Sequence, residues 1–203
     1  MCANGPADLW GFTVWRTVYS LGSDAKFARA LDIINQWVES ECFEDVDKTH
    51  TDTGAEDVNY RAAREVWKRY ENVVIEDRSL EGASPDAVRK KFAAWTESKG
   101  VDWRQQSSRN RFCILIDEEA LETFSWFPPP PSRRGLTERQ ECSVKVIDVE
   151  LDGDDDDRYP HGYKCCLMTP PWMLAHIYHF SHNIGSDKMR DAIGGMPVYG
   201  FAK

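Results

Sequence analysis

The sequence predicts an α+β fold in which helices pack on one face of a mostly antiparallel sheet. Strand-like and amphipathic helical segments alternate along the first 124 residues, and two further strand-like segments follow residue 142 as a hairpin. Strands interleaved with helices and closed by a hairpin are typical of an α+β sandwich, of which an elaborated ferredoxin-like unit is one arrangement. At 203 residues with 41% hydrophobic content, we expect a single domain over residues 1–203.

The first predicted strand covers residues 11–19. Phe12, Val14 and Val18 lie on one side of its pleat, and Trp15 lies on the other with three polar or aromatic neighbours. Because both sides carry large side chains, we expect this strand to contribute to the core.

Apolar residues at steps of three and four predict a helix that follows Gly22 and ends near Cys42. Residues 43–57 have no period and few apolar groups, so we expect a mobile loop there. A helix over residues 57–70 and a short strand over 73–75 follow.

The middle of the chain contains the clearest helix start. Ser84 is a residue type that caps free amides, and Pro85 suits the first helical position, so we expect a helix that ends at Gly100. Residues 111–117 are apolar on both sides and predict a central strand, followed by a helical turn over 118–124.

The last part of the chain is divided by prolines and acids. We expect a proline-rich connection at residues 127–135, strands over 143–151 and 163–168, and an acidic hairpin loop at 152–162, before a last helix over 172–182. The acidic loop resembles a calcium loop only at its start, because Tyr159 stands where a bidentate glutamate is needed.

Composition limits the function classes. The net charge of -9 argues against sequence-independent nucleic-acid binding, which needs a basic surface. No window approaches the roughly 20 apolar residues that cross a membrane, and the first residues do not have the pattern of a signal peptide. The six cysteines are therefore expected as reduced thiols, and we expect a cytoplasmic protein.

Three stretches resemble a known family. GFTVWRTVY at residues 11–19, CILIDEEAL at 113–121 and GGMPVYGF at 194–201 are similar to a large family of uncharacterised proteins of filamentous fungi. That family has no established activity, so the resemblance assigns no functional residue to this chain.

Two carboxylates and a histidine are the candidate catalytic residues. Asp117 and Glu118 follow the predicted central strand, where catalytic acids and bases often lie, and neighbouring carboxylates raise one another's pKa. His176 on the last helix is the candidate partner. The simpler interpretation is that the acids cap a helix and favour its dipole, which we weight more heavily.

A metal site is not favoured, and we expect no cofactor. Cys165, His176 and His179 are the candidate ligands of a zinc site, but no CxxC or HExxH spacing supports it. Three histidines at steps of three spread over about 120° of a helix, so they do not converge on one ion.

The run Phe127 to Pro131 is the sharpest short motif. Four prolines favour a polyproline II helix, so Phe127 and Pro128 with the following prolines resemble an EVH1 ligand. Pro128, Pro131 and Arg133 match the PxxPxR pattern of SH3 ligands. A stiff, exposed spacer is the alternative interpretation of the same residues.

Two function classes follow from these patterns. The favoured one is a noncatalytic protein that binds partner proteins through the proline-rich segment or binds a small ligand. The alternative is a small acid–base or metal-assisted enzyme that acts on a small molecule. Neither class names a ligand or a substrate.

Overall fold

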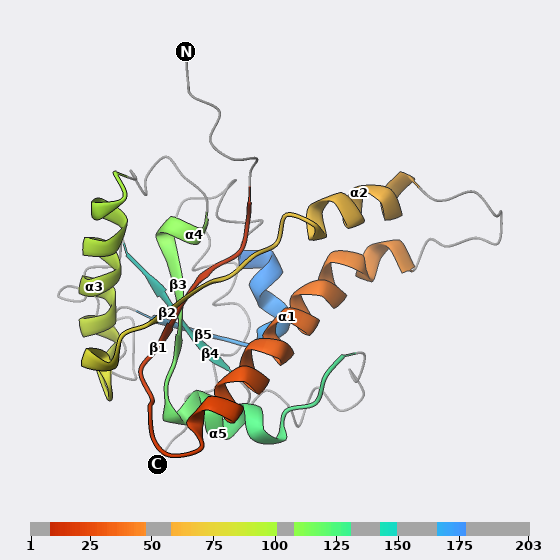
Figure 1. Cartoon of the computed structure of the whole chain (residues 1–203). Helices are drawn as coiled ribbons and strands as arrows, with labels where there is room; N and C mark the ends of the chain where they lie inside the picture. The colour runs from red at the N-terminus through yellow and green to blue at the C-terminus, as the bar shows by residue number, and fades with distance from the viewer. Residues whose placement is uncertain (1–8, 48–57, 101–107, 131–142, 150–165, 178–203) are drawn as a thin grey trace.

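The computed structural model describes residues 9–47, 58–100, 108–130, 143–149 and 166–177 (Figure 1). It contains helices and a five-stranded mixed sheet, which confirms the α+β class. The described elements are, in chain order, β1 (Thr13–Arg16), α1 (Ser23–Asp47), α2 (Val58–Trp67), β2 (Val73–Glu76), the 3-10 helix η1 (Arg78–Leu80), α3 (Pro85–Ser98), α4 (Ser108–Arg111), β3 (Phe112–Ile116), α5 (Glu118–Trp126), β4 (Val144–Asp148), β5 (Cys166–Thr169) and the 3-10 helix η3 (Pro171–Met173).

The strand order is β2-β1-β3-β4-β5, and the expected mostly antiparallel sheet is wrong. Strand β1 is parallel to both of its neighbours, β2 and β3, and β3 is the central strand, as residues 111–117 predict. Only the pairs β3–β4 and β4–β5 are antiparallel. A strand with two parallel neighbours also leaves the ferredoxin-like arrangement without support.

Helices cover both faces of the sheet, which corrects the expected one-sided packing. In Figure 1, α1 and α5 lie on one side of the strands and α3 lies on the other. Phe12, Val14 and Ile114 join the core beneath α1, whereas Trp15 and Leu115 join a second core with α3. Parallel strands joined by helical crossovers need cover on both faces, because each face is apolar.

The parallel part of the sheet is built from two crossovers. The connection through α1 and α2 places β2 on one side of β1, and the connection through α3 returns the chain to the other side as β3. The two crossovers step in opposite directions and use opposite faces, so they have the same hand. The carboxyl ends of all three strands therefore open at one edge of the sheet.

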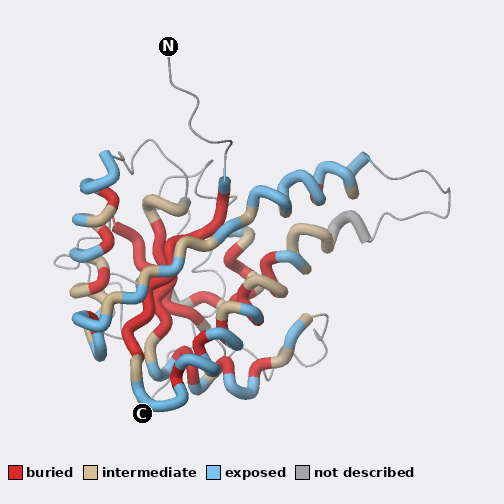
Figure 2. Tube along the Cα trace, viewed as in Figure 1, coloured by how far each residue is buried: buried red, intermediate tan, exposed pale blue. Residues whose placement is uncertain are grey.

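The predicted hairpin of β4 and β5 is confirmed. Val144 pairs with Thr169 and Ile147 pairs with Cys166 in a regular antiparallel register. All five residues of β4 are buried, because helices cover both faces (Figure 2). The adjacent Val146 and Ile147 thus face two different cores.

Glycine allows one close approach beside this sheet. Gly11 has φ +135°, and a Cβ at this position would overlap the carbonyl oxygen of Glu71. The main chain of Trp10 accepts from Glu71 at 2.8 Å and donates to Arg69 at 2.9 Å. The segment before β1 is therefore fastened to the segment before β2.

Several predicted boundaries differ from the structure. The first helix continues past Cys42 to Asp47, so residues 43–47 are helical and not part of a loop. The rest of the expected mobile loop and the acidic loop at 152–162 lie outside the described residues. Of the predicted last helix, the structure describes residues 172–177, and Leu174 and Ile177 are buried as expected.

Phe127, a candidate partner-binding residue of the proline-rich segment, is a core residue. It is 0% exposed and lies between α1 and η3, with its ring 5.9 Å from that of Trp37 and 6.1 Å from that of Trp172. The Trp37 indole also donates to the Pro128 carbonyl at 3.2 Å. The start of the proline run is thus anchored to the core, while Pro131 and Arg133 lie outside the described residues.

We predict that Phe127→Ala destabilises the protein by about 3–5 kcal/mol, because it removes a buried ring and leaves a cavity. Urea unfolding followed by tryptophan fluorescence measures the change. Trp126→Ala is the matched control, since the neighbouring Trp126 is 52% exposed and its loss should cost about 1 kcal/mol or less. Equal effects of the two variants would contradict the core assignment.

Candidate functional site

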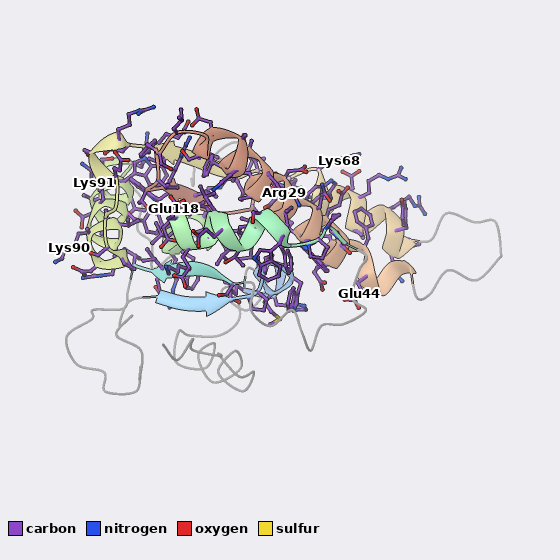
Figure 3. The ribbon with its side chains drawn as sticks, turned by 90° about the horizontal axis from the view of Figure 1, so that it is seen from below. Arg29, Glu44, Lys68, Lys90, Lys91 and Glu118 are labelled. Atoms are coloured by element: carbon purple, nitrogen blue, oxygen red, sulfur yellow. The ribbon has the colours of Figure 1, made fainter. Side chains whose placement is uncertain are left out.

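The candidate site lies at the edge where the parallel strands end. In open sheets with parallel strands and helices on both faces, ligands bind outside the carboxyl ends of the strands, among the loops that follow them. Backbone hydrogen bonds fix these loops: Thr17 donates to Ile116 at 3.1 Å, and Gly82 donates to Thr17 at 2.8 Å. Figure 3 looks onto this edge from below, with Glu118 labelled at the start of α5 and Arg29 on α1.

Arg16, the last residue of β1, is a buried cation at this edge. Its Nε donates to the Val18 carbonyl at 2.7 Å, and its Nη2 donates to the Ser23 hydroxyl at 2.8 Å. The same Nη2 bonds Asp24 at 2.5 Å, and Nη1 bonds Glu76 at 2.7 Å. One side chain thus joins the ends of β1 and β2 to the first turn of α1.

The surroundings keep this guanidinium charged. Burial lowers the pKa of Arg16, but the hydrogen bonds and charges of Asp24 and Glu76 outweigh it and raise the pKa above its ordinary value. The guanidinium carbon lies 4.8 Å from the ring centroids of both Tyr19 and Phe27, within the range of cation–π attraction. Arg16 is therefore a fixed positive charge.

A pocket of about 600 Å³ opens beside Arg16. It is lined by six residues from the end of β1 and the loop after it, the start of α1, the end of β2 and the start of η1: Arg16, Tyr19, Asp24, Phe27, Glu76 and Arg78. The side chains of Asp24 and Glu76 are 85% and 53% exposed, whereas that of Arg16 is 5% exposed. The pocket thus presents two carboxylates that a buried cation holds in place.

Aromatic rings form part of the pocket lining. Tyr19 donates its hydroxyl to the Arg16 carbonyl at 3.0 Å, and its ring lies 5.1 Å from the Arg78 guanidinium carbon. Burial raises the pKa of Tyr19, and the charge of Arg16 offsets this only in part. The phenol therefore stays protonated at neutral pH.

A second buried cation, Lys145, lies on the opposite face of the same edge. Its Nζ bonds Asp117 at 2.5 Å and Glu119 at 2.6 Å, and its side chain is 6% exposed. Burial lowers the pKa of Lys145, but the two carboxylates raise it above its ordinary value. A lysine held in this charged form is not available as a nucleophile or base.

The three candidate catalytic residues are not brought together. Asp117 caps α5 by accepting from the Ala120 amide at 3.1 Å, which confirms the structural interpretation of this residue, and it also pairs with Lys145. Glu118 is exposed at the start of α5. His176 lies 3.5 Å from Glu41, which is seventeen residues and about 25 Å along α1 from Asp24.

No group of three metal-ligating side chains occurs within the described part of the chain. Of the candidate ligands, Cys165 and His179 lie outside that part, so a zinc site stays a prediction. None of the described helices has both the length and the apolar character needed to span a membrane.

Sequence reasoning missed the Arg16 cluster. Its signal is the one charged residue, an arginine, in the predicted strand 11–19, at a position where alternation places the side chain toward the core. A buried arginine requires acidic partners, but Asp24 and Glu76 are separated by 52 positions in the sequence. Only the fold identifies them as a pair.

Comparisons of the chain with protein-family models, with curated proteins and with solved structures give no match.

We predict that Lys145 stabilises the fold at neutral pH and loses this effect at alkaline pH. The unfolded lysine titrates near 10.5 and the folded one above it, so the contribution is complete below 10.5 and disappears as the pH rises through the folded value. Lys145→Met should cost about 1–3 kcal/mol at pH 7 and less at pH 11.

Urea unfolding of the wild-type protein and the variant at both pH values measures this difference. Lys90→Met is the control, because Lys90 is 70% exposed on α3 and should give a small difference at each pH. A Lys145→Met cost that does not fall toward pH 11 would exclude the charged pair as its cause.

Proposed function

We propose that this protein is a noncatalytic, cytoplasmic protein that binds a small polar molecule in the Arg16 pocket. The observation that carries the proposal is the pair of exposed carboxylates, Asp24 and Glu76, which a buried arginine fixes at the carboxyl edge of the parallel strands. Side chains that are already held in position lose little conformational freedom when a ligand binds. The volume of about 600 Å³ is within the range of small-molecule sites.

Binding is favoured over acid–base catalysis because of how the charged groups are used. The candidate acids Asp117 and Glu118 do not contact His176, and the Lys145 ammonium is held by two carboxylates. General acid–base chemistry needs a proton donor and an acceptor that reach the same substrate atoms. The described residues at this edge offer fixed charges instead.

Partner docking through the proline-rich segment has weaker support than ligand binding. An EVH1-type ligand uses the phenylalanine ring, and the Phe127 ring is buried. The SH3-type pattern depends on Pro131 and Arg133 as well as Pro128, so docking of an SH3-like domain stays a prediction. We keep it as a second, separate property of the chain.

We predict that a screen of small polar metabolites by ligand-observed NMR detects a binder that needs Asp24. Asp24→Asn should weaken its binding roughly tenfold, because the substitution removes one of the two pocket charges. Asp86→Asn is the matched control, since Asp86 occupies the first turn of α3 as Asp24 does in α1.

Thermal melts of both variants check that the fold is retained. Binding that Asp24→Asn reduces and Asp86→Asn leaves unchanged would support the pocket. The absence of any binder, or a binder that is indifferent to Asp24→Asn, would refute the proposed function.

A further inference from the structure

We propose that the ligand of this pocket is a small zwitterion of the amino-acid type, with an ammonium group at Asp24 and Glu76 and an acidic group at Arg78. This inference rests on the proposed function and names its ligand class. It follows from the separation of positive and negative charge within the pocket.

One end of the pocket is negative. Arg16 supplies one positive charge to two carboxylates, so the group of Arg16, Asp24 and Glu76 has a formal charge of −1. The bonds to Arg16 use Asp24 Oδ1 and Glu76 Oε1. Asp24 Oδ2 and Glu76 Oε2 accept no hydrogen bond from the described residues, so both are free to accept from a ligand.

An ammonium group suits this end better than a hydroxyl group. It has three donors and no acceptor, and its charge compensates the excess negative charge. Hydrogen bonds with an ionised donor or acceptor are roughly twice as strong as those between neutral groups. The buried Arg16 cannot leave to make room for an anion, because its Nε and Nη2 also bond Val18 and Ser23.

The other end of the pocket is positive. Arg78 begins η1, two residues after Glu76, and its side chain is exposed. Its guanidinium contacts the Tyr19 ring and makes no hydrogen bond to a side chain or carbonyl of the described residues. It therefore keeps its donor fork for an acidic ligand group, which it can bind in bidentate fashion.

The two ends are close together. Arg16 and Arg78 lie 4.8 and 5.1 Å from the centroid of the same Tyr19 ring, so their guanidinium carbons are separated by about 10 Å at most. Both ends therefore border one pocket of small-molecule size. Free amino acids carry both charges on one small molecule, and a ligand with a single charge leaves one end unpaired.

The test titrates the ¹⁵N-labelled full chain with the twenty common L-amino acids, each accompanied by its primary amide and its N-acetyl derivative. The amide lacks the carboxylate, and the N-acetyl derivative lacks the ammonium group. We expect at least one amino acid to bind roughly tenfold more tightly than both of its derivatives, with shifts of the Tyr19 and Arg78 amide signals.

Arg78→Gln separates the two ends of the pocket. It should weaken binding of that amino acid to the level of its amide, while binding of the amide itself stays unchanged. Because Arg78 is exposed, the variant should melt at the wild-type temperature. An amino acid that binds equally well to Arg78→Gln would overturn the inference.

The outcome also separates this inference from the proposed function. If no amino acid binds but the metabolite screen yields an Asp24-dependent binder with one charge or none, the zwitterion inference fails and the binding function stands. If the screen yields no Asp24-dependent binder either, both fail.

Discussion

The buried guanidinium of Arg16 is the interaction on which the functional edge depends. It makes four hydrogen bonds at the end of β1, two of them to carboxylates from different elements. Burying an arginine without partners would cost several kcal/mol of folding free energy. The pairing with Asp24 and Glu76 therefore has to be kept while Arg16 is buried at the end of β1. The same constraint that stabilises the fold therefore orients two carboxylates toward solvent.

The sheet topology places this cluster at an edge that is open to ligands. Because β2, β1 and β3 are parallel, their carboxyl ends and the loops that follow lie together, while α1 and α3 occupy opposite faces. Arg16 lies on the α1 face and Lys145 on the α3 face, each paired with two carboxylates. Only the Arg16 cluster borders the described pocket, which is why the proposed binding site belongs to it.

Features with a local cause could be predicted from the sequence. Ser84 accepts from the Ala87 amide at 3.3 Å, and Asp117 caps α5, because capping depends on residues three positions apart. The sheet direction could not be predicted, since Thr13 pairs with Val73 and Cys113, far along the chain. The burial of Phe127 also depends on residues far along the chain. Its local sequence favours polyproline II structure, but its ring packs against Trp37 and Trp172. The Arg16 site could not be predicted for two reasons. Its acidic partners are distant in the sequence, and the only local signal is a single charged residue in a strand.

The burial of Arg16 can be measured by the hydrogen exchange rate of its Nε–H group, with NMR on the ¹⁵N-arginine-labelled protein. Assignment comes from the signal that Arg16→Lys removes. A buried donor bonded to the Val18 carbonyl should exchange at least about tenfold more slowly than the exposed Arg78 side chain, and its signal should shift when a ligand binds. An Arg16 signal that exchanges as fast as that of Arg78 would show that the guanidinium is not buried at this edge, and would contradict the fixed carboxylate pair of the pocket.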